Sequence, residues 1–189
     1  MVNVGFICEG DTEVKIVKSE GFQTLLQSLN LRCVIPIEDA DGNGNLLPHK
    51  LESKRAKLKG GGAEVVVILT DLDKDASVNT TKERITEMNG QHIIVAVKEA
   101  EAWFLASSTV LSEIVGEPVW FDKPEEDNEP FETIRQLFLE KTGRGVGTKP
   151  ILARRMLKYG FTIQQAARHP NCPSAGYFLS TLQILASAN

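Results

Sequence analysis

The chain has 189 residues, of which 42% are apolar and 24% are charged, as is typical of one ordinary globular domain rather than a disordered chain. The formal net charge of −4 argues against a protein that coats nucleic acid by bulk positive charge. Three cysteines without paired spacing argue against a disulfide framework or a zinc site, so we expect reduced thiols.

The sequence gives no signal for a membrane. No stretch approaches the roughly 20 continuous apolar residues of a membrane-spanning helix, and the first residues lack the basic start of a signal peptide. We therefore expect a cytoplasmic protein without a membrane partner.

Hydrophobic periodicity predicts alternating strands and helices in the first half of the chain. The predicted order is strand 2–8, helix 12–29, strand 31–37, helix 47–59, strand 64–70, helix 80–89 and strand 92–98. This alternation indicates a Rossmann-like α/β fold with a mainly parallel four-stranded sheet flanked by helices. The second half is predicted to be helical, over 99–113, 130–142, 149–158, 161–168 and 174–187. We divide the chain into an α/β domain, 1–113, and a helical C-terminal extension packed on it, 114–189.

Acidic residues follow three of the predicted strands. Glu9 follows the first strand, Asp71 and Asp73 follow the third, and Glu99 and Glu101 follow the fourth. The carboxyl ends of parallel strands meet at one edge of the sheet, where open α/β proteins bind ligands. One acid after a strand is usually a helix cap or a solvated turn, but three strand ends that share the pattern indicate a site.

The third predicted strand leads directly into acids spaced by two residues, Asp71, Asp73 and Asp75. If the chain stays extended, all three side chains face the same way. Oxygen ligands clustered in this manner suit Mg²⁺ or Mn²⁺, and such an ion can stabilise charge on a phosphoryl group.

At these residues the sequence resembles the TOPRIM domain shared by topoisomerases, bacterial primases and OLD-type nucleases. The family signature is Glu-Gly after the first strand and Asp-x-Asp after the third, here Glu9-Gly10 and Asp71-Leu72-Asp73. The chain is more specifically similar to small, uncharacterised bacterial TOPRIM proteins, because Gly44-Asn45 precedes the second predicted helix and Glu101-Ala102-Trp103 follows the fourth strand. The resemblance covers about residues 1–110 and, more loosely, 149–178.

The resemblance implies that Asp71 and Asp73 bind Mg²⁺ and that Glu9 is a further ligand or a general acid/base. We add Glu101 as a fourth acid of the metal site. These roles imply metal-dependent phosphodiester chemistry on nucleic acid, as in a small TOPRIM nuclease or a nuclease-like effector. Glu9, Asp71 and Asp73 are then the catalytic residues.

Basic residues supply the candidate phosphate contacts. Between 135 and 168 the sequence carries eight basic residues against one acid, which predicts a phosphate-binding face that includes Lys149, Arg154 and Arg155. Lys50 and Lys54 share one face near the start of a predicted helix, so they can reach a phosphate at the acidic edge or simply form a solvated helix face.

Glycine contributes one further candidate for the substrate site. Gly10 directly follows Glu9, where its small size would allow a tight turn or the close approach of a substrate.

Several alternatives stay open. The protein is alternatively a non-catalytic module that binds metal, nucleotide or nucleic acid beside a separate partner such as an ATPase. A haloacid-dehalogenase-like phosphatase, with Asp71 as nucleophile, is a further enzyme class, but that class usually places its Asp-x-Asp at the first strand. The segment 39–50 begins like a calcium-binding EF-hand loop, but Lys50 stands where the loop needs a bidentate glutamate.

Overall fold

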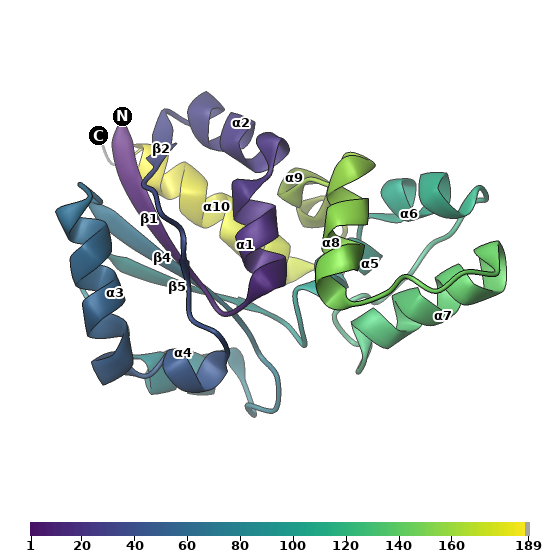
Figure 1. Cartoon of the computed structure of the whole chain (residues 1–189), viewed down its shortest axis with the longest axis horizontal. Coiled ribbons are helices and arrows are strands. Elements are labelled where there is room, and N and C mark those ends of the chain that lie inside the picture. The colour runs from purple at the N-terminus through teal and green to yellow at the C-terminus, as the bar shows by residue number, and fades with distance from the viewer. Residues whose placement is uncertain (188–189) are drawn as a thin grey trace.

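The structure is a computed structural model that describes residues 1–187. A central parallel sheet is covered by helices on both faces, and a group of helices lies beyond one end of the strands (Figure 1). The strand order is β2-β1-β4-β5, so the predicted α/β class and parallel sheet are confirmed. Within residues 1–187, no helix combines the length and the apolar character needed to cross a bilayer.

Three long strands form the centre of the sheet: β1 (Val2–Cys8), β4 (Val65–Asp71) and β5 (Gln91–Ala96). β4 lies between the other two, with Ile7 opposite Ile68 and Ile68 opposite Ile93. This parallel register places the carboxyl ends of β1 and β4 beside each other, which determines the position of the candidate site.

Only the first part of the predicted strand 31–37 is a strand, and a separate short strand follows at 38–39, so within residues 1–187 the sheet has five strands and not the expected four. β2 (Leu31–Cys33) and β3 (Glu38–Asp39) both pair with β1, at opposite ends of its length. Pro36 lies in the gap between them and has no backbone N–H to donate to a neighbouring strand. The chain therefore pairs with β1 twice, and the segment 34–37 between the two short strands is not part of the sheet.

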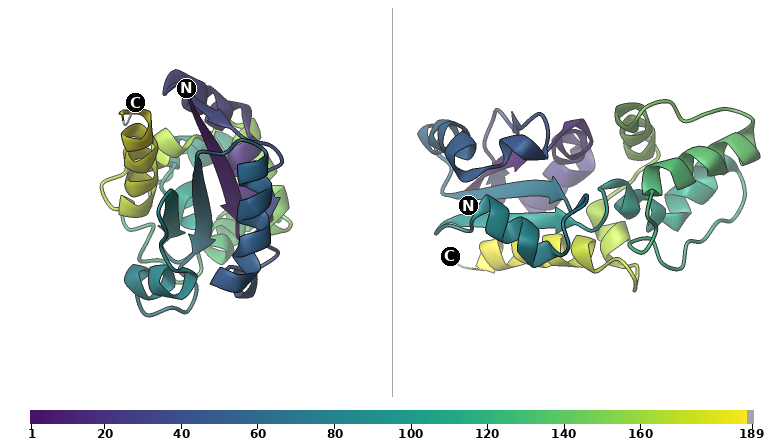
Figure 2. Two further views of the ribbon diagram at one scale, coloured as in Figure 1. Left: turned by 90° about the vertical axis from the view of Figure 1, so that its left-hand side faces the viewer. Right: turned by 90° about the horizontal axis from the view of Figure 1, so that it is seen from below.

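Alternate residues of the strands enter two apolar cores. Val67 and Leu69 of β4 join a large core with α1 (Asp11–Lys18), α2 (Glu20–Ser28) and α10 (Pro173–Ser187). Val66 and Ile68 face the opposite core, under α3 (Pro48–Gly60) and α4 (Val78–Ile85). Two further views show this layered arrangement (Figure 2). Burial on both faces explains why β1 and β4 read as continuous apolar runs.

Two of the predicted helices are broken. The predicted helix 12–29 is divided between α1 and α2 at Ser19, whose hydroxyl accepts a hydrogen bond from the Phe22 N–H and so caps a new helix. The predicted helix 99–113 consists of α5 (Glu101–Leu105) and α6 (Ser108–Val115), with Ser107 in a non-helical conformation between them.

The remaining elements complete the helical part of the chain. A 3-10 turn, η1 (Asn43–Asn45), precedes α3, and three further helices follow α6: α7 (Pro130–Thr142), α8 (Lys149–Lys158) and α9 (Ile163–Ala167). α8 packs against α1, and α10 packs against β5. The last helix therefore returns to the sheet, and α8 reaches the edge where β1 and β4 end.

Candidate metal site at the carboxyl ends of the strands

Glu9, Asp71 and Asp73 come together at the ends of β1 and β4. Each offers a carboxylate oxygen, and these oxygens all lie within 4.8 Å of one another. Their proximity follows from the strand pairing, because the Glu9 N–H continues the ladder past β1 by donating to the Leu69 carbonyl over 2.8 Å. We call these three residues the acidic triad.

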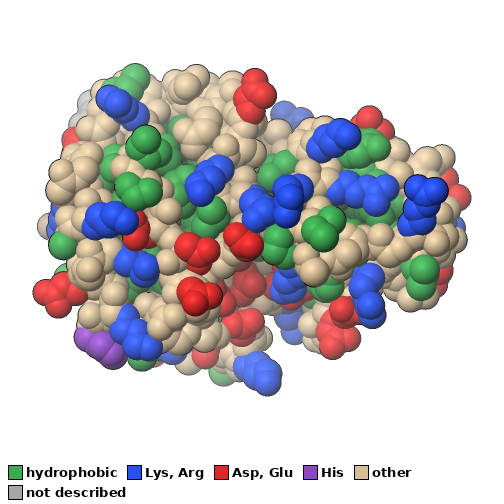
Figure 3. Space-filling model, viewed as in Figure 1, with side chains coloured by type: hydrophobic (Ala, Val, Ile, Leu, Met, Phe, Trp, Pro, Cys, Tyr) green, Lys and Arg blue, Asp and Glu red, His purple; other side chains and the backbone are tan. Residues whose placement is uncertain are grey.

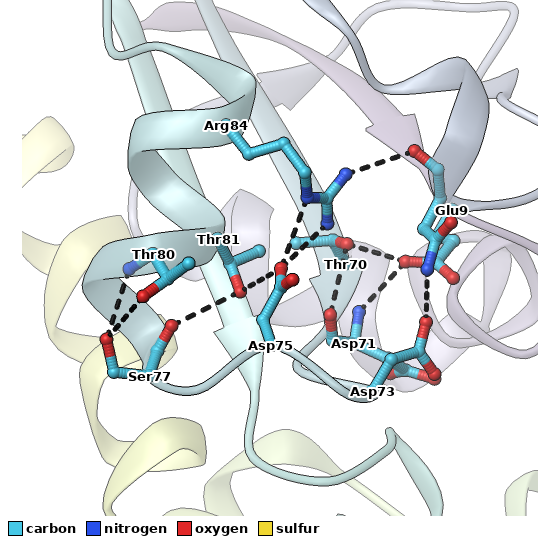
Figure 4. A network of polar contacts seen from close by, with 10 residues as sticks. Glu9, Thr70, Asp71, Asp73, Asp75, Ser77, Thr80, Thr81 and Arg84 are labelled. Carbon is cyan, nitrogen blue, oxygen red and sulfur yellow. Dashed lines mark hydrogen bonds and ion pairs between the residues drawn. The ribbon is translucent and has the colours of Figure 1, made fainter.

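The backbone of the strand ends fixes two members of the triad. Glu9 Oε2 accepts hydrogen bonds from the Thr70 hydroxyl at 2.5 Å and from the Asp71 N–H at 3.1 Å (Figure 4). Asp71 Oδ1 accepts from the Ala100 N–H at 2.8 Å, and the Asp71 side chain is buried. Neither carboxylate is free to swing into solvent.

Asp73 is held by a different kind of contact. Its backbone takes a left-handed conformation, with φ of 49°, and its N–H donates to the Lys98 carbonyl over 3.1 Å. The Asn43 side-chain amide donates to Asp73 Oδ2 over 2.5 Å. A residue from the loop before α3 therefore orients the exposed member of the triad.

The turn at Asp73 sends Asp75 away from the triad. Asp75 Oδ2 accepts from the Thr81 hydroxyl and forms an ion pair with Arg84 at 3.1 Å, as Figure 4 shows. Arg84 also donates to the Asn43 carbonyl over 3.2 Å. The chain does not stay extended beyond Asp71, so the three aspartates do not face the same way, and Asp75 supports the site through Arg84 and Asn43 instead.

A cleft of about 430 Å³ opens beside Glu9 and Asp71. Its lining includes the loop around β3, the first turn of α1 and the start of α8. Of the described residues that line it, only Lys149 is basic. Seven are acidic, namely Glu9, Asp11, Glu13, Asp39, Asp41, Asp71 and Glu101. The cleft is strongly negative when these groups are ionised.

Glu101 lies in the same cleft but outside the triad. Its side chain is 1% exposed, and Oε1 accepts from the Thr12 hydroxyl at 2.9 Å. Oε2 forms an ion pair with Lys149 at 3.3 Å, and Lys149 also pairs with Glu99. The structure thus brings the predicted fourth acid into the cleft but holds it against a lysine, and Glu101 is not among the acids whose oxygens cluster within 4.8 Å.

Burial raises the pKa of several carboxyl groups in the cleft. Loss of solvent raises the pKa of Asp71 well above its usual range, and the charges of Glu13, Glu101 and Glu9 add to the effect. Burial raises the pKa of Glu13 to about 8, with the charge of Glu101 contributing. The pKa of Glu9 is also raised by burial, although its hydrogen bond from Thr70 opposes the shift. A divalent cation would offset this crowding of negative charge.

Lys149 is the basic counterpart of these acids. Burial alone would lower its pKa, but the charge of Glu101 and the contact with Glu99 raise it above the usual range of a lysine. Lys149 therefore carries its charge at neutral pH.

The other predicted substrate contacts lie in different places. Lys50 donates to the Gly44 carbonyl and Asn45 Oδ1, and Lys54 donates to the Asp39 carbonyl, so both are bound to the neighbouring loop. Arg155 lies over the Phe138 ring at 4.7 Å, and Arg154 lines a separate groove beyond α1.

Gly10 lines the cleft, but its backbone is extended, with φ of −157°. A Cβ there would meet only Glu13 Oε2, at 3.8 Å. The glycine therefore takes no left-handed conformation, and the space beside it opens toward the cleft.

Three contributors were missed by sequence reasoning. Glu13 is buried in α1, three and four residues before Ile16 and Val17, so its place on the apolar face of a helix was the available signal. Asn43 and Arg84 support the site from a loop and from α4, and no local pattern distinguishes them from solvated residues.

In comparisons with known proteins, no family model, no curated protein and no solved structure matches this chain.

Proposed function

We propose that the protein uses Mg²⁺ or Mn²⁺ at the acidic triad to cleave phosphodiester bonds in nucleic acid, as a small nuclease of TOPRIM-like type. The observation that supports this most is the convergence of three carboxylates from two adjacent parallel strands within 4.8 Å. Exposed acids often cluster without a ligand, but Asp71 is buried and Asp73 is oriented by Asn43.

The donor set fits the proposed ion. Mg²⁺ and Mn²⁺ prefer hard oxygen ligands, and Mg²⁺ is typically bound through one or two carboxylates while it retains several waters. All three members of the triad offer carboxylate oxygens, and the adjoining cleft has room for water and substrate. A bound ion would supply a Lewis acid for the phosphoryl oxygens and lower the pKa of a water molecule.

The charge of the cleft is a second argument for a metal. The acids of the cleft repel a polyanionic substrate when they are ionised, and Lys149 is already paired with Glu101 and Glu99. A phosphodiester can approach Asp71 and Glu9 only when cations offset that charge.

Glu9 is the residue best suited to move a proton. Burial raises its pKa above that of an ordinary glutamate, which makes its carboxylate a stronger general base. One oxygen is occupied by Thr70 and the Asp71 N–H, and these bonds hold the other oxygen in a fixed position. Asp71 and Asp73 are then the ligands that define the site.

A cleavage assay tests the proposal directly. Single- and double-stranded DNA and RNA are incubated with Mg²⁺ or Mn²⁺ and with the parent protein, Asp71→Asn or Glu9→Gln. Glu113→Gln is the control, because Glu113 is exposed and lies in α6, away from the cleft. We expect cleavage in the parent and the control and none in the two site variants.

Two other results would indicate a different function. Metal-dependent thermal stabilisation without cleavage would make the protein a metal- and nucleotide-binding module that acts beside a partner such as an ATPase. A phosphoryl group trapped on Asp71 during turnover of a phosphomonoester would instead place the protein among phosphatases with an aspartate nucleophile.

A further inference from the structure

A second cavity, of about 870 Å³, lies between the α1–α2 corner and the α8–α9 corner. Four of its lining residues are basic, namely Lys15, Lys18, Arg154 and Lys158. Among the described lining residues only Glu20 is acidic. We call this cavity the basic groove. On the face that Figure 3 shows, Lys and Arg side chains gather where α1 and α8 meet, beside a group of acidic side chains.

The basic groove continues from the acidic cleft along the same two helices. α1 begins at Asp11, which lines the cleft, and ends at Lys18, which lines the groove. α8 begins at Lys149 in the cleft and ends at Lys158 in the groove. Because α1 packs against α8, the two cavities lie at opposite ends of one helix pair. We call the surface along this pair the path, and its charge changes from negative at the cleft to positive at the groove.

Three of the groove cations are available to a ligand. Lys15 pairs with Asp11 at 3.1 Å, but within residues 1–187 Lys18, Arg154 and Lys158 form no ion pair or side-chain hydrogen bond, and all three are exposed. Arg154 and Lys158 are four residues apart and so share one face of α8.

The helix dipole explains part of this arrangement but not all of it. Lys18 and Lys158 lie in the last turns of their helices, where a positive charge is favourable. Arg154 lies a turn earlier, and the dipole gives no reason for the three cations to converge on one cavity. A polyanionic ligand explains both the position of Arg154 and the convergence of the three cations on one cavity.

We infer that the basic groove binds the phosphate backbone of the nucleic acid whose scissile bond lies at the acidic triad. The choice of nucleic acid rests on the proposed function, although binding in the groove does not require cleavage. With a rise of 1.5 Å per residue, α8 carries the path over about 14 Å from Lys149 to Lys158. At about 3.4 Å per stacked nucleotide, this distance corresponds to roughly four nucleotides.

The groove should recognise phosphate rather than bases. Phe161 is the aromatic side chain of the described lining, and it is buried, so it offers no exposed ring for stacking. Binding should therefore depend on salt concentration and on strand length but little on sequence.

The test is a binding measurement in EDTA, so that it does not depend on metal chemistry. Fluorescence anisotropy compares single-stranded oligonucleotides of 3, 6, 12 and 20 residues and a 20-base-pair duplex, each at several salt concentrations. The groove variant is Lys18→Gln/Arg154→Gln/Lys158→Gln. The control, Arg32→Gln/Lys59→Gln/Lys123→Gln, removes the same charge from exposed residues outside the groove.

We expect affinity for single strands to rise between 3 and 6 nucleotides, because a longer strand can contact all the exposed cations of the groove at once. At 100 mM salt the groove variant should lose about tenfold or more in affinity, and its salt slope should fall by about 2, since each lost contact with a single strand contributes roughly 0.7. The control should bind like the parent. The form, strand or duplex, whose affinity falls in the groove variant is the form that the groove binds.

Equal binding by the parent and a folded groove variant would overturn the inference, as would a 3-mer that binds as tightly as a 12-mer. The two proposals fail separately. Groove-dependent binding without cleavage under any metal would reject the nuclease and keep the groove, whereas cleavage with groove-independent binding would reject only the groove.

Discussion

Two regions of the molecule bury glutamate side chains in opposite ways. In the helical part, Glu125 is 8% exposed and accepts hydrogen bonds from the Ser174 N–H at 2.9 Å and from the Ser174 hydroxyl at 2.6 Å. The same hydroxyl accepts from Trp103 Nε1 at 2.7 Å, so one connected network joins α5, α10 and the loop before α7. In the acidic cleft, Glu13 is 4% exposed, and burial raises its pKa, with the charges of Glu101 and Glu9 adding to the shift.

The difference separates a stabilising network from a site. A buried polar group whose partners are satisfied holds elements together, and removal of one partner exposes the full cost of desolvation. Like charges buried together weaken the fold unless a ligand offsets them, so a cleft of this kind persists at a cost to stability. Variants of the two regions should therefore move stability and activity in opposite directions.

The largest effect is expected for Asp71→Asn. Loss of a metal ligand removes several kcal/mol of transition-state stabilisation, so we expect cleavage to fall by at least about a thousandfold. The amide oxygen still accepts the Ala100 N–H, so the melting temperature in EDTA should not fall. Cleavage rates and thermal unfolding of the same preparation check both parts, and a destabilised variant would show that Asp71 is structural.

Ser174→Ala should lower the stability of the fold and leave cleavage nearly unchanged. It leaves the Trp103 N–H without its partner and leaves Glu125 with only the backbone N–H of residue 174, which should cost about 2–4 kcal/mol in the free energy of unfolding. Urea denaturation measures this loss, and cleavage at low temperature should stay near that of the parent. Ser180→Ala is the matched control, because Ser180 lies in the same helix and, among residues 1–187, its hydroxyl donates only to the Tyr177 carbonyl. Equal losses in both serine variants would contradict the distinction.

Glu13→Gln should stabilise the metal-free protein in a pH-dependent manner. The pKa of Glu13 is raised from 4.5 to about 8, so its contribution to stability is fully present below about pH 4.5 and is lost as the pH rises to about 8. Glutamine cannot ionise, so the variant should exceed the parent by about 2–4 kcal/mol at pH 8 and by little at pH 5.

Unfolding curves in EDTA at several pH values measure this difference. Glu113→Gln, at an exposed position, should show no such trend. A Glu13→Gln advantage that is the same at pH 5 and pH 8 would mean that charge is not the cause.

The smallest effect is expected for Asn43→Ala, which removes the hydrogen bond that orients Asp73. Loss of a partner that positions a ligand typically weakens metal binding by 10- to 100-fold, and we expect the lower end because Asp73 is exposed. Asn45→Ala is the control from the same loop, since Asn45 contacts Asp41 and Lys50 instead. Mn²⁺ titrations of the two variants distinguish them, and equal affinities would remove Asn43 from the site.

Sequence reasoning succeeded where a local rule determines position. The acids after β1 and β4 could be placed because strand ends in a parallel sheet share an edge, and the register brings Glu9 beside Asp71. The course of the chain after Asp71 could not be predicted in the same way. It depends on a left-handed residue at Asp73 and on an ion pair between Asp75 and Arg84, which lies nine residues further along.

The cleft also depends on contacts between distant segments. Lys149 meets Glu99 and Glu101 across about fifty residues of sequence because α8 packs against α1, and periodicity carries no information on that packing. The break at Ser19 could have been predicted more easily. Serine is a favoured N-cap residue, and here its hydroxyl accepts a hydrogen bond from the Phe22 N–H.

The central claim is that the acidic triad binds a divalent cation. Isothermal titration of Mn²⁺ into the metal-free parent, Asp71→Asn and Glu113→Gln tests it most directly. The account predicts saturable binding in the parent and in Glu113→Gln, and its loss in a folded Asp71→Asn. No binding in the parent, or equal binding in all three proteins, would contradict it.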